Sequence, residues 1–373
     1  MRPDREDRHV TLVPPGGGAR TASAAERPRP SFSRFAARCH DEYLGAFRPL
    51  RLEGFVLGPA TRPFGGARCR LESVVLHHGV DGAPWAATAS VAEGALVLVF
   101  AGSPGAVFHV DGHDVARDAV CAVGPGARAT IVARRAGEWC AITLPAARLP
   151  ELTGAGSPAP AGGAVAWRLR REDLSRLRAM VFRAISASES AGPGGPAREG
   201  AAAHETELVA FLEAALAAGG GSPARAAVSR VSRHEVLEKV DRLLDERSGE
   251  PVYVADLCRA TGLPERTLRY VLVEQYGTSP VRLLRNRRLC QLRRELLEPD
   301  PAAGSLSQLA ARHGFWHMGT LAADYRRLFG ELPSETRRAG AVEEERPSDV
   351  LVRPARERPG GGPAALVEAV AGR

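Results

Sequence analysis

Two arginines near the start of a short amphipathic segment carry the clearest chemistry in this sequence. Arg266 and Arg269 lie beside Glu265 and Tyr270 in the run GLPERTLRYVLVEQYGTSP. A guanidinium group can donate two hydrogen bonds to guanine, while a carboxylate can accept from cytosine and a tyrosine can contact phosphate. On one helix face, these side chains would fit the major groove of DNA. The alternative is an ordinary solvated helix face, and the surrounding pattern must decide.

The elements that would position these residues occur twice between residues 251 and 338. In each copy, apolar and small residues at helical spacing flank a turn glycine, Gly262 in the first copy and Gly314 in the second. After the first turn, Leu268 and Leu272 recur at i and i+4 and predict the buried stripe of a second helix. The second copy repeats this spacing. Two helices joined by a short turn form a helix-turn-helix unit, so the sequence predicts two such units.

One helix is predicted between the two units, over residues 280–297. At roughly 1.5 Å per residue, this helix can hold the units about one turn of DNA apart, roughly 34 Å. Two adjacent segments of the major groove would then be contacted from one side of the duplex.

Further DNA contacts are predicted outside the first unit. The second unit offers short or apolar side chains, better suited to thymine methyl groups or backbone positioning than to strong base recognition: His317, Met318, Thr320 and Ala323. The candidate phosphate contacts are arginines, whose charge would steepen the salt dependence of binding: Arg287, Arg293, Arg294, Arg326 and Arg327. Arg288 is also consistent with a structural role, and Trp316 is equally consistent with a core or interdomain anchor.

This double motif resembles the DNA-binding domain of the AraC/XylS family of bacterial transcription regulators. The resemblance is carried by the run quoted above, the helix RRLCQLRRELL and the closing LAARHGFWHMGTLAADYRRLFGELPSETRR. It covers residues 232–338. The sequence departs from the family at Pro264 and Gly319, where serine is usual, and at Leu321, where phenylalanine is usual. Proline is compatible with a helix start, whereas Gly319 would lose an N-cap hydroxyl worth roughly a few tenths of a kcal/mol.

The composition limits the classes of protein open to this chain. With 373 residues, it is longer than one usual domain. Its net charge of +7 comes almost wholly from arginine, since Lys239 is the only lysine. This charge suits phosphate contact, although a GC-rich genome would produce the same excess of arginine. No apolar run reaches the roughly 18 residues of a membrane span and no signal core is visible, so we expect a cytoplasmic protein without a membrane partner.

Residues 31–150 consist of short apolar runs separated by Gly, Pro and Asp. Six of these runs predict strands, over residues 70–77, 95–101, 106–110, 120–123, 130–133 and 139–144. Strands without intervening helices are typical of a barrel or sandwich. The family resemblance implies a cupin-like β-barrel here that senses a small-molecule effector. A short helix is predicted before it, over residues 35–47.

Residues 160–218 form a predicted helical connector with two amphipathic helices, 166–188 and 202–218. This pair could form a homodimer contact or pack on its own barrel. Residues 219–230 have the composition of a flexible linker before the DNA-binding domain at 231–338. The tails, 1–30 and 339–373, are predicted to be disordered. The predicted fold is multidomain α+β, with a barrel, a connector and an all-α double helix-turn-helix domain.

Enzymatic function has little support in the spacing of the histidines and cysteines. His77 and His78 are adjacent, so a strand would point them to opposite faces, and His109 and His113 flank a turn. The six cysteines show no metal-binding spacing and are expected to be reduced thiols. We therefore expect no metal, no cofactor and no catalytic residue. The alternative is a cupin-type metalloenzyme fused to a DNA-binding domain, and a third hypothesis is a barrel that serves only for dimerisation.

The prediction is therefore a sequence-specific transcription regulator that responds to an effector. The resemblance implies an activator that contacts RNA polymerase and binds double-stranded DNA as a dimer on repeated half-sites. An effector can act only by binding one arrangement of barrel and DNA-binding domain better than another. The sequence leaves the effector and the target operon open.

Overall fold

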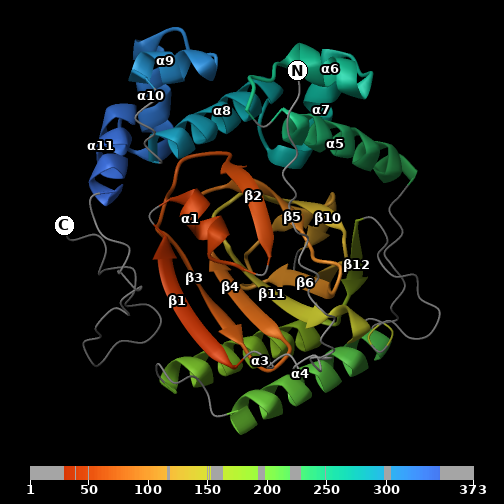
Figure 1. The fold of residues 1–373 in the computed structure, drawn as a ribbon. Helices are drawn as coiled ribbons and strands as arrows, with labels where there is room; N and C mark the ends of the chain where they lie inside the picture. The colour runs from red at the N-terminus through yellow and green to blue at the C-terminus, as the bar shows by residue number, and fades with distance from the viewer. Residues whose placement is uncertain are drawn as a thin grey trace, which may run out of the picture.

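The computed structural model describes residues 29–344, apart from residues 38, 49, 116–117, 149, 151, 153–162, 192–197, 219–227, 248 and 298–303. Two β-sheets lie at the centre, with a pair of helices on one side and the C-terminal helices on the other (Figure 1). The predicted disordered tails and flexible linker fall mainly outside the described residues. The multidomain α+β fold predicted from the sequence is confirmed.

The strands pair antiparallel in both sheets. Sheet A has the order β1 (Ser31–Ala37), β3 (Phe64–Arg70), β4 (Val75–Val80), β11 (Glu138–Pro145), β6 (Ala95–Ala101), β9 (Ala119–Val123) and β12 (Ala164–Arg168). Sheet B has the order β2 (Arg51–Val56), β5 (Trp85–Ser90), β10 (Arg128–Ala133), β7 (Phe108–Val110) and β8 (His113–Val115). Among the described strands, no continuous hydrogen-bonded ladder closes the two sheets into a barrel, so the domain is a two-sheet sandwich.

The strands β6, β9 and β11 of sheet A are apolar on both faces. In β6, Val97 and Val99 belong to the core between the sheets, whereas Leu96, Leu98 and Phe100 belong to the cluster on the outer face. Successive side chains of a strand point to opposite faces, so a strand that is apolar throughout needs cover on both sides. A further layer must therefore pack on the outer face of the sheet.

The layer over sheet A consists of α3 (Arg171–Ser190) and α4 (Arg198–Ala218). Leu174, Leu177 and Val181 of α3 are fully buried and pack in the outer cluster of the sheet. Burying one side chain of this size stabilises the fold by about 1.5–3 kcal/mol. Of the two possibilities left open by the sequence, this chain uses the buried faces of the connector helices to cover its own sheet.

The layer over sheet B is the C-terminal domain. Its helices are α5 (Val228–Glu246), α6 (Val254–Thr261), α7 (Glu265–Tyr276), α8 (Pro280–Leu297), α9 (Leu306–Arg312), α10 (Met318–Phe329) and α11 (Pro333–Glu344). Ala86 and Val132 on the outer face of sheet B share one apolar cluster with Val240 of α5 and with Leu268 and Leu272 of α7. The two domains therefore share a core.

A predicted strand over residues 70–77 is instead two strands, β3 and β4. The Leu71 N–H donates to the Val74 carbonyl oxygen (2.9 Å) in the turn between them. Glu205 of α4 holds this turn because its carboxylate accepts a hydrogen bond from the Ser73 N–H (2.8 Å). A contact with a helix 132 residues away along the chain cannot be predicted from the local pattern.

Two predicted helices begin later than expected, because strand pairing takes their first residues. Within the predicted helix 35–47, the first residues belong to β1, which pairs with β3, and α1 (His40–Gly45) follows. Within the predicted helix 166–188, the first residues belong to β12, which pairs with β9, and α3 begins at Arg171. Sheet A therefore extends past residue 150, the expected end of the sensor domain.

Candidate nucleic-acid interface

The first predicted unit consists of α6 and α7. Leu268 and Leu272 of α7 are fully buried, which turns the opposite face of this helix outward. Tyr270 on that face exposes 64% of its surface. The structure places all four predicted contact residues of this unit on the exposed side: Glu265, Arg266, Arg269 and Tyr270.

The ends of both helices are fixed by local structure. Gly262 (φ 73°) ends α6 and Gly277 (φ 69°) ends α7 in the left-handed conformation that favours glycine. At the start of α6, the Asp256 carboxylate accepts a hydrogen bond from the Tyr253 N–H (2.9 Å). Pro264 is the N-cap of α7, so the departure from the family at this position is compatible with the helix.

The second unit, α9 and α10, has smaller exposed side chains. Leu321 and Tyr325 are fully buried, and the Tyr325 hydroxyl donates to Thr336 Oγ1 (2.9 Å). His317 is the N-cap of α10, so Gly319 lies inside the helix and the expected loss of a cap at Gly319 is wrong. Three of the four predicted contacts of this unit are exposed, and Met318 is half-buried: His317, Met318, Thr320 and Ala323.

Arg288 of α8 lies between the two units. Its guanidinium carbon is 5.5 Å from the ring centroid of Tyr253, which precedes α6, and 5.2 Å from that of Phe315, which precedes α10. A guanidinium over an aromatic face is attracted by the electrons of the ring. One arginine therefore links the two units, which favours the structural role for Arg288.

Three of the five arginines expected to contact phosphate are partnered within the protein. Arg287 is buried and donates to the Leu244 carbonyl oxygen, and its burial lowers its pKa to about 10. Arg293 pairs with Glu331 (2.7 Å). Arg294, the third, contacts the N-terminal domain. Because a phosphate contact would first break these bonds, the three side chains are structural in this arrangement.

The other two predicted phosphate contacts lie on α10. Arg326 is exposed. Arg327 exposes 64% of its side chain and pairs with the buried Asp324, which also pairs with Arg285 of α8. Both guanidinium groups can reach a ligand at the surface.

α8 also carries contacts between the domains. Arg294 donates from Nε to Asp41 of α1 (2.6 Å) and from Nη2 to the Gly54 carbonyl oxygen of β2. The side-chain amide of Asn286 donates to the Leu57 carbonyl oxygen (2.9 Å). The helix that joins the two units is thereby bonded to the N-terminal domain.

Asp241 of α5 makes a second set of interdomain contacts. Its carboxylate accepts from the Thr130 hydroxyl of β10 and from the Tyr276 hydroxyl at the end of α7 (3.0 Å). Burial raises the pKa of Asp241 to about 6. Arg134 donates to the Gln275 carbonyl oxygen (3.0 Å), and a cavity of about 100 Å³ lies beside Asp241 and Tyr276. The C-terminal end of α7 is therefore fixed on sheet B.

The interior of the sandwich contains a small apolar cavity. Its volume is about 20 Å³, which is room for about one water molecule. Trp85, Val99, Phe108 and Trp139 are among the residues that line it. In this arrangement the side chains of the domain fill its interior.

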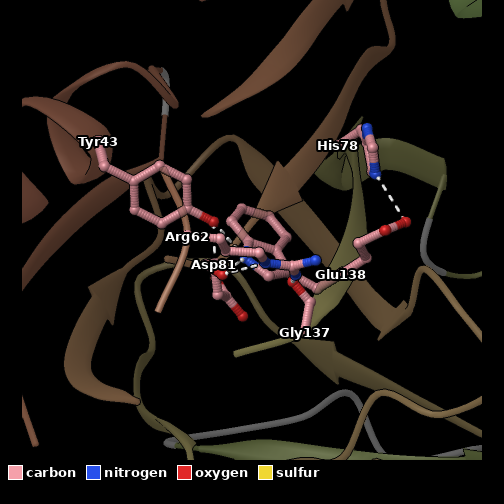
Figure 2. A network of polar contacts seen from close by, with 7 residues as sticks. Tyr43, Arg62, His78, Asp81, Gly137 and Glu138 are labelled. Atoms are coloured by element: carbon pink, nitrogen blue, oxygen red, sulfur yellow. Dashed lines mark hydrogen bonds and ion pairs between the residues drawn. The ribbon is translucent and has the colours of Figure 1, made fainter. Parts of the chain in front are cut away.

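A polar network borders this interior (Figure 2). The Tyr43 hydroxyl donates to the Asp81 carboxylate (2.7 Å), and Trp139 Nε1 donates to the same group (3.0 Å). Arg62 donates to the Asp81 carbonyl oxygen (2.8 Å). Burial raises the pKa of Asp81 to about 7 although these donors favour its charged form. Because Tyr43 and Asp41 both belong to α1, this helix contacts the interior of the sandwich and also α8.

The adjacent histidines on β4 point to opposite faces, as predicted. His77 is fully buried and its ring lies 6.0 Å from that of Phe47, between the sheets. His78 lies on the other face, 4.8 Å from the Phe182 ring of α3, and its Nε2 is 3.4 Å from Glu138 Oε2. In the ranges that the structure describes, no three His, Cys, Asp or Glu side chains are placed to bind a metal ion. No described helix combines the length and apolar character needed to cross a bilayer.

Known proteins resemble this chain mainly in its helix-turn-helix region. The family described as "Helix-turn-helix domain" matches residues 257–339. The "Probable thc operon regulatory protein" of Rhodococcus erythropolis is 36% identical over 92 residues, 25% of this chain and 28% of that protein. The "XylDLEGF operon transcriptional activator 2" of Pseudomonas putida is 31% identical over 106 residues, 28% of this chain and 68% of that protein.

The matched segment thus spans about three-tenths of the first of these relatives. Among solved structures, the AraC-like transcriptional activator CuxR overlaps with 70% of this chain and 96% of its own, at 14% identity and a TM-score of 0.34.

Sequence reasoning missed the interdomain residues Asp41, Asp241 and Asn286. The sequence of α8 contained a pattern that could have predicted an interdomain contact, because its apolar residues do not form a single stripe. Its buried positions include Leu283, Leu284, Asn286, Arg287, Leu289, Cys290, Leu292 and Leu296. A helix buried on several sides must contact more than one neighbour.

Replacing Arg266 and Arg269 together by alanine is expected to remove discrimination between DNA sites and to leave weak, salt-sensitive binding. Each lost base contact should cost roughly 1–3 kcal/mol. The measurement is the ratio of dissociation constants for a specific and an unrelated duplex of equal length at one salt concentration. Arg171→Ala, an exposed arginine on α3, is the matched control. Unchanged discrimination in the double variant would mean that another face contacts the bases.

Asp81→Asn is expected to change how stability depends on pH. An unfolded aspartate titrates near pH 4, whereas Asp81 in the folded chain keeps its proton to about pH 7. Between these values only the folded state holds the proton, so this group makes the free energy of unfolding fall as pH rises, by roughly 2–4 kcal/mol. Above about pH 7 the contribution is constant.

Asparagine does not titrate, so the variant lacks this fall. The free energy of unfolding of the variant minus that of the wild type should therefore be larger at pH 8 than at pH 5. Urea unfolding of both proteins at the two pH values measures this difference, and the other titrating groups cancel. Asp118→Asn, at an exposed pair with Arg168, is the control. Parallel pH profiles for the wild type and Asp81→Asn would contradict the assigned protonation.

Proposed function

The chain belongs to the AraC/XylS family of bacterial transcription regulators, and on this basis we propose that it binds promoter DNA and regulates transcription. The observation that carries the proposal is the exposed pair Arg266 and Arg269, opposite the buried Leu268 and Leu272 on α7. Both guanidinium groups are free to approach base edges, and α7 is the second helix of the first helix-turn-helix unit, the position that enters the major groove.

The second unit contributes weaker contacts in this proposal. Thr320 and Ala323 contact thymine methyl groups, and His317 and Met318 position α10 on the duplex. Arg326 and Arg327 are the proposed phosphate contacts, because their side chains lie at the surface. Glu265 and Tyr270 complete the surface of the first unit.

We further propose that the N-terminal domain controls how the C-terminal domain is docked. The shared core on sheet B and the polar contacts of Arg294, Asn286 and Asp241 fix one arrangement of the two domains. A small-molecule effector would change DNA binding by favouring or disfavouring this arrangement. α1 offers the connection, since Tyr43 borders the sandwich interior and Asp41 bonds to α8.

The direction of regulation and the assembly are proposed from the relatives. Relatives named as activators support an activator, which requires a contact with RNA polymerase. A homodimer on repeated half-sites would double the contacted surface. The proposal contains no catalytic step and no cofactor.

The filled interior of the sandwich favours a second candidate function for the N-terminal domain. With about 20 Å³ of free volume, the domain could serve for dimerisation alone, without enclosing a ligand. Thermal unfolding of the full chain with candidate effectors separates the two functions, because a bound ligand raises the melting temperature by mass action. A concentration-independent dimer with no ligand that shifts the melting temperature would support the second candidate.

Mapping where the purified chain binds across its own genomic DNA, at a stated salt concentration, tests the proposed function. We expect a few sharp sites upstream of an operon, and the proteins encoded there would indicate the class of effector. The Arg266→Ala/Arg269→Ala variant should lose these sites. Binding spread evenly along the genome would instead rule out sequence-specific regulation.

Asp41→Asn is expected to loosen the contact between the domains. The substitution removes the charge that Arg294 pairs with at 2.6 Å, so hydrogen exchange in α1 and β2 should become faster. If docking controls DNA binding, the affinity for a mapped site should change several-fold. Asp118→Asn, which removes an exposed pair with Arg168 of β12, is the control. Faster exchange with unchanged DNA affinity would mean that docking and DNA binding are independent.

A further inference from the structure

Trp316 is exposed, in contrast to the other tryptophans of the chain. Trp85, Trp139 and Trp167 expose 1%, 5% and 4% of their surface, whereas Trp316 exposes 75%. An indole is a large apolar group with a single N–H donor, and it gains most when the apolar body is covered and the donor is bonded. The sequence suggested a core or interdomain anchor for Trp316, and the structure contradicts both. None of the residues that the structure describes covers this indole, so we look for its partner elsewhere.

The backbone around Trp316 is held in a defined position. Gly314 ends the turn after α9 with φ 75°, and the Phe315 N–H donates to the Ala310 carbonyl oxygen (2.9 Å). The Phe315 ring is buried beneath Arg288, and the next residue after Trp316 is His317, the N-cap of α10. Phe315 points inward and Trp316 outward, so the indole is presented at the start of α10 by a fixed turn.

The neighbours of Trp316 indicate what the indole contacts. The exposed residues at the start of α10 are small, with Gly319, Thr320 and Ala323 offering little contact area. In the first unit, the corresponding helix α7 exposes two arginines and a tyrosine. Among the described residues of the second unit, Trp316 is the large hydrophobic side chain that is exposed. It precedes the start of α10, and the start of a recognition helix lies at the groove beside the sugar-phosphate backbone.

We propose that Trp316 is a DNA-backbone contact of the second unit. Its ring packs on deoxyribose and its Nε1–H donates to a phosphate oxygen, as tyrosine, serine and backbone donors do in other protein–DNA interfaces. This inference rests on the proposed function, because it requires that the C-terminal domain binds DNA. The contact positions α10 and does not read a base. It therefore contributes to binding of any duplex, unlike Arg266 and Arg269.

Tryptophan fluorescence tests this contact directly in the full chain. Because the other three tryptophans are buried, acrylamide quenches Trp316 selectively, and the Trp316→Phe variant supplies the background signal. A fluorescently labelled random-sequence duplex at low salt serves as the probe, and its anisotropy reports binding independently. We expect bound duplex to protect Trp316 from acrylamide.

Measurements of DNA affinity provide a second test of the Trp316 contact. Trp316→Ala should weaken binding to the random duplex and to a mapped genomic site by the same factor, about tenfold. Trp316→Phe should fall between the wild type and alanine, because it keeps a ring and loses the donor. The unfolding midpoints should be equal for all three proteins, since the side chain is exposed.

The outcomes separate the inference from the proposed function. If the duplex binds while Trp316 stays fully quenchable and Trp316→Ala binds as tightly as the wild type, the inference is overturned and the proposed function stands. If no duplex binds at all, both fail. If Trp316 becomes protected on raising the protein concentration without DNA, its partner is a second copy of the chain and the DNA contact is again overturned.

Discussion

The structure depends on covering the outer faces of both β-sheets, which carry buried apolar side chains such as Leu98 in sheet A and Val132 in sheet B. Each such sheet needs a layer on each side, and the sandwich supplies only the inner one. The helices α3 and α4 provide the second layer for sheet A, and the C-terminal domain provides it for sheet B. The helix-turn-helix domain is consequently part of the N-terminal domain's core. It is not a module attached by a linker alone.

Polar contacts then select one orientation on that apolar surface. Apolar packing tolerates sliding, whereas a buried hydrogen bond is lost when its partners move by an ångström or two. Asp241, Asn286 and Arg294 each bond across the interface, from three different places in the C-terminal domain. Of the α8 arginines expected to contact phosphate, Arg294 serves this orientation instead, whereas Arg287 and Arg293 bond within the C-terminal domain.

The sequence predicted what depends on local spacing. The 3.6-residue period of Leu268 and Leu272 identified α7 and its exposed face, and β6 was found at its full length as an apolar run. It did not predict β1 or β12, whose strand character comes from pairing with β3 and β9. Nor could the charge of Arg287 and Arg294 reveal that they are partnered within the protein, because their partners, the Leu244 carbonyl and Asp41, are distant in the sequence.

The position of Arg288 between Tyr253 and Phe315 has a consequence for the DNA that this chain can recognise. A single guanidinium in contact with both units resists bending of α8 and rotation of one unit against the other. The protein itself then fixes the distance between α7 and α10 and their rotation relative to one another. Two or three extra base pairs between the contacted segments would turn one segment away by roughly a quarter of a helical turn. If the chain binds DNA as proposed, its target sites are accordingly expected to vary in base sequence more readily than in the spacing of their two halves.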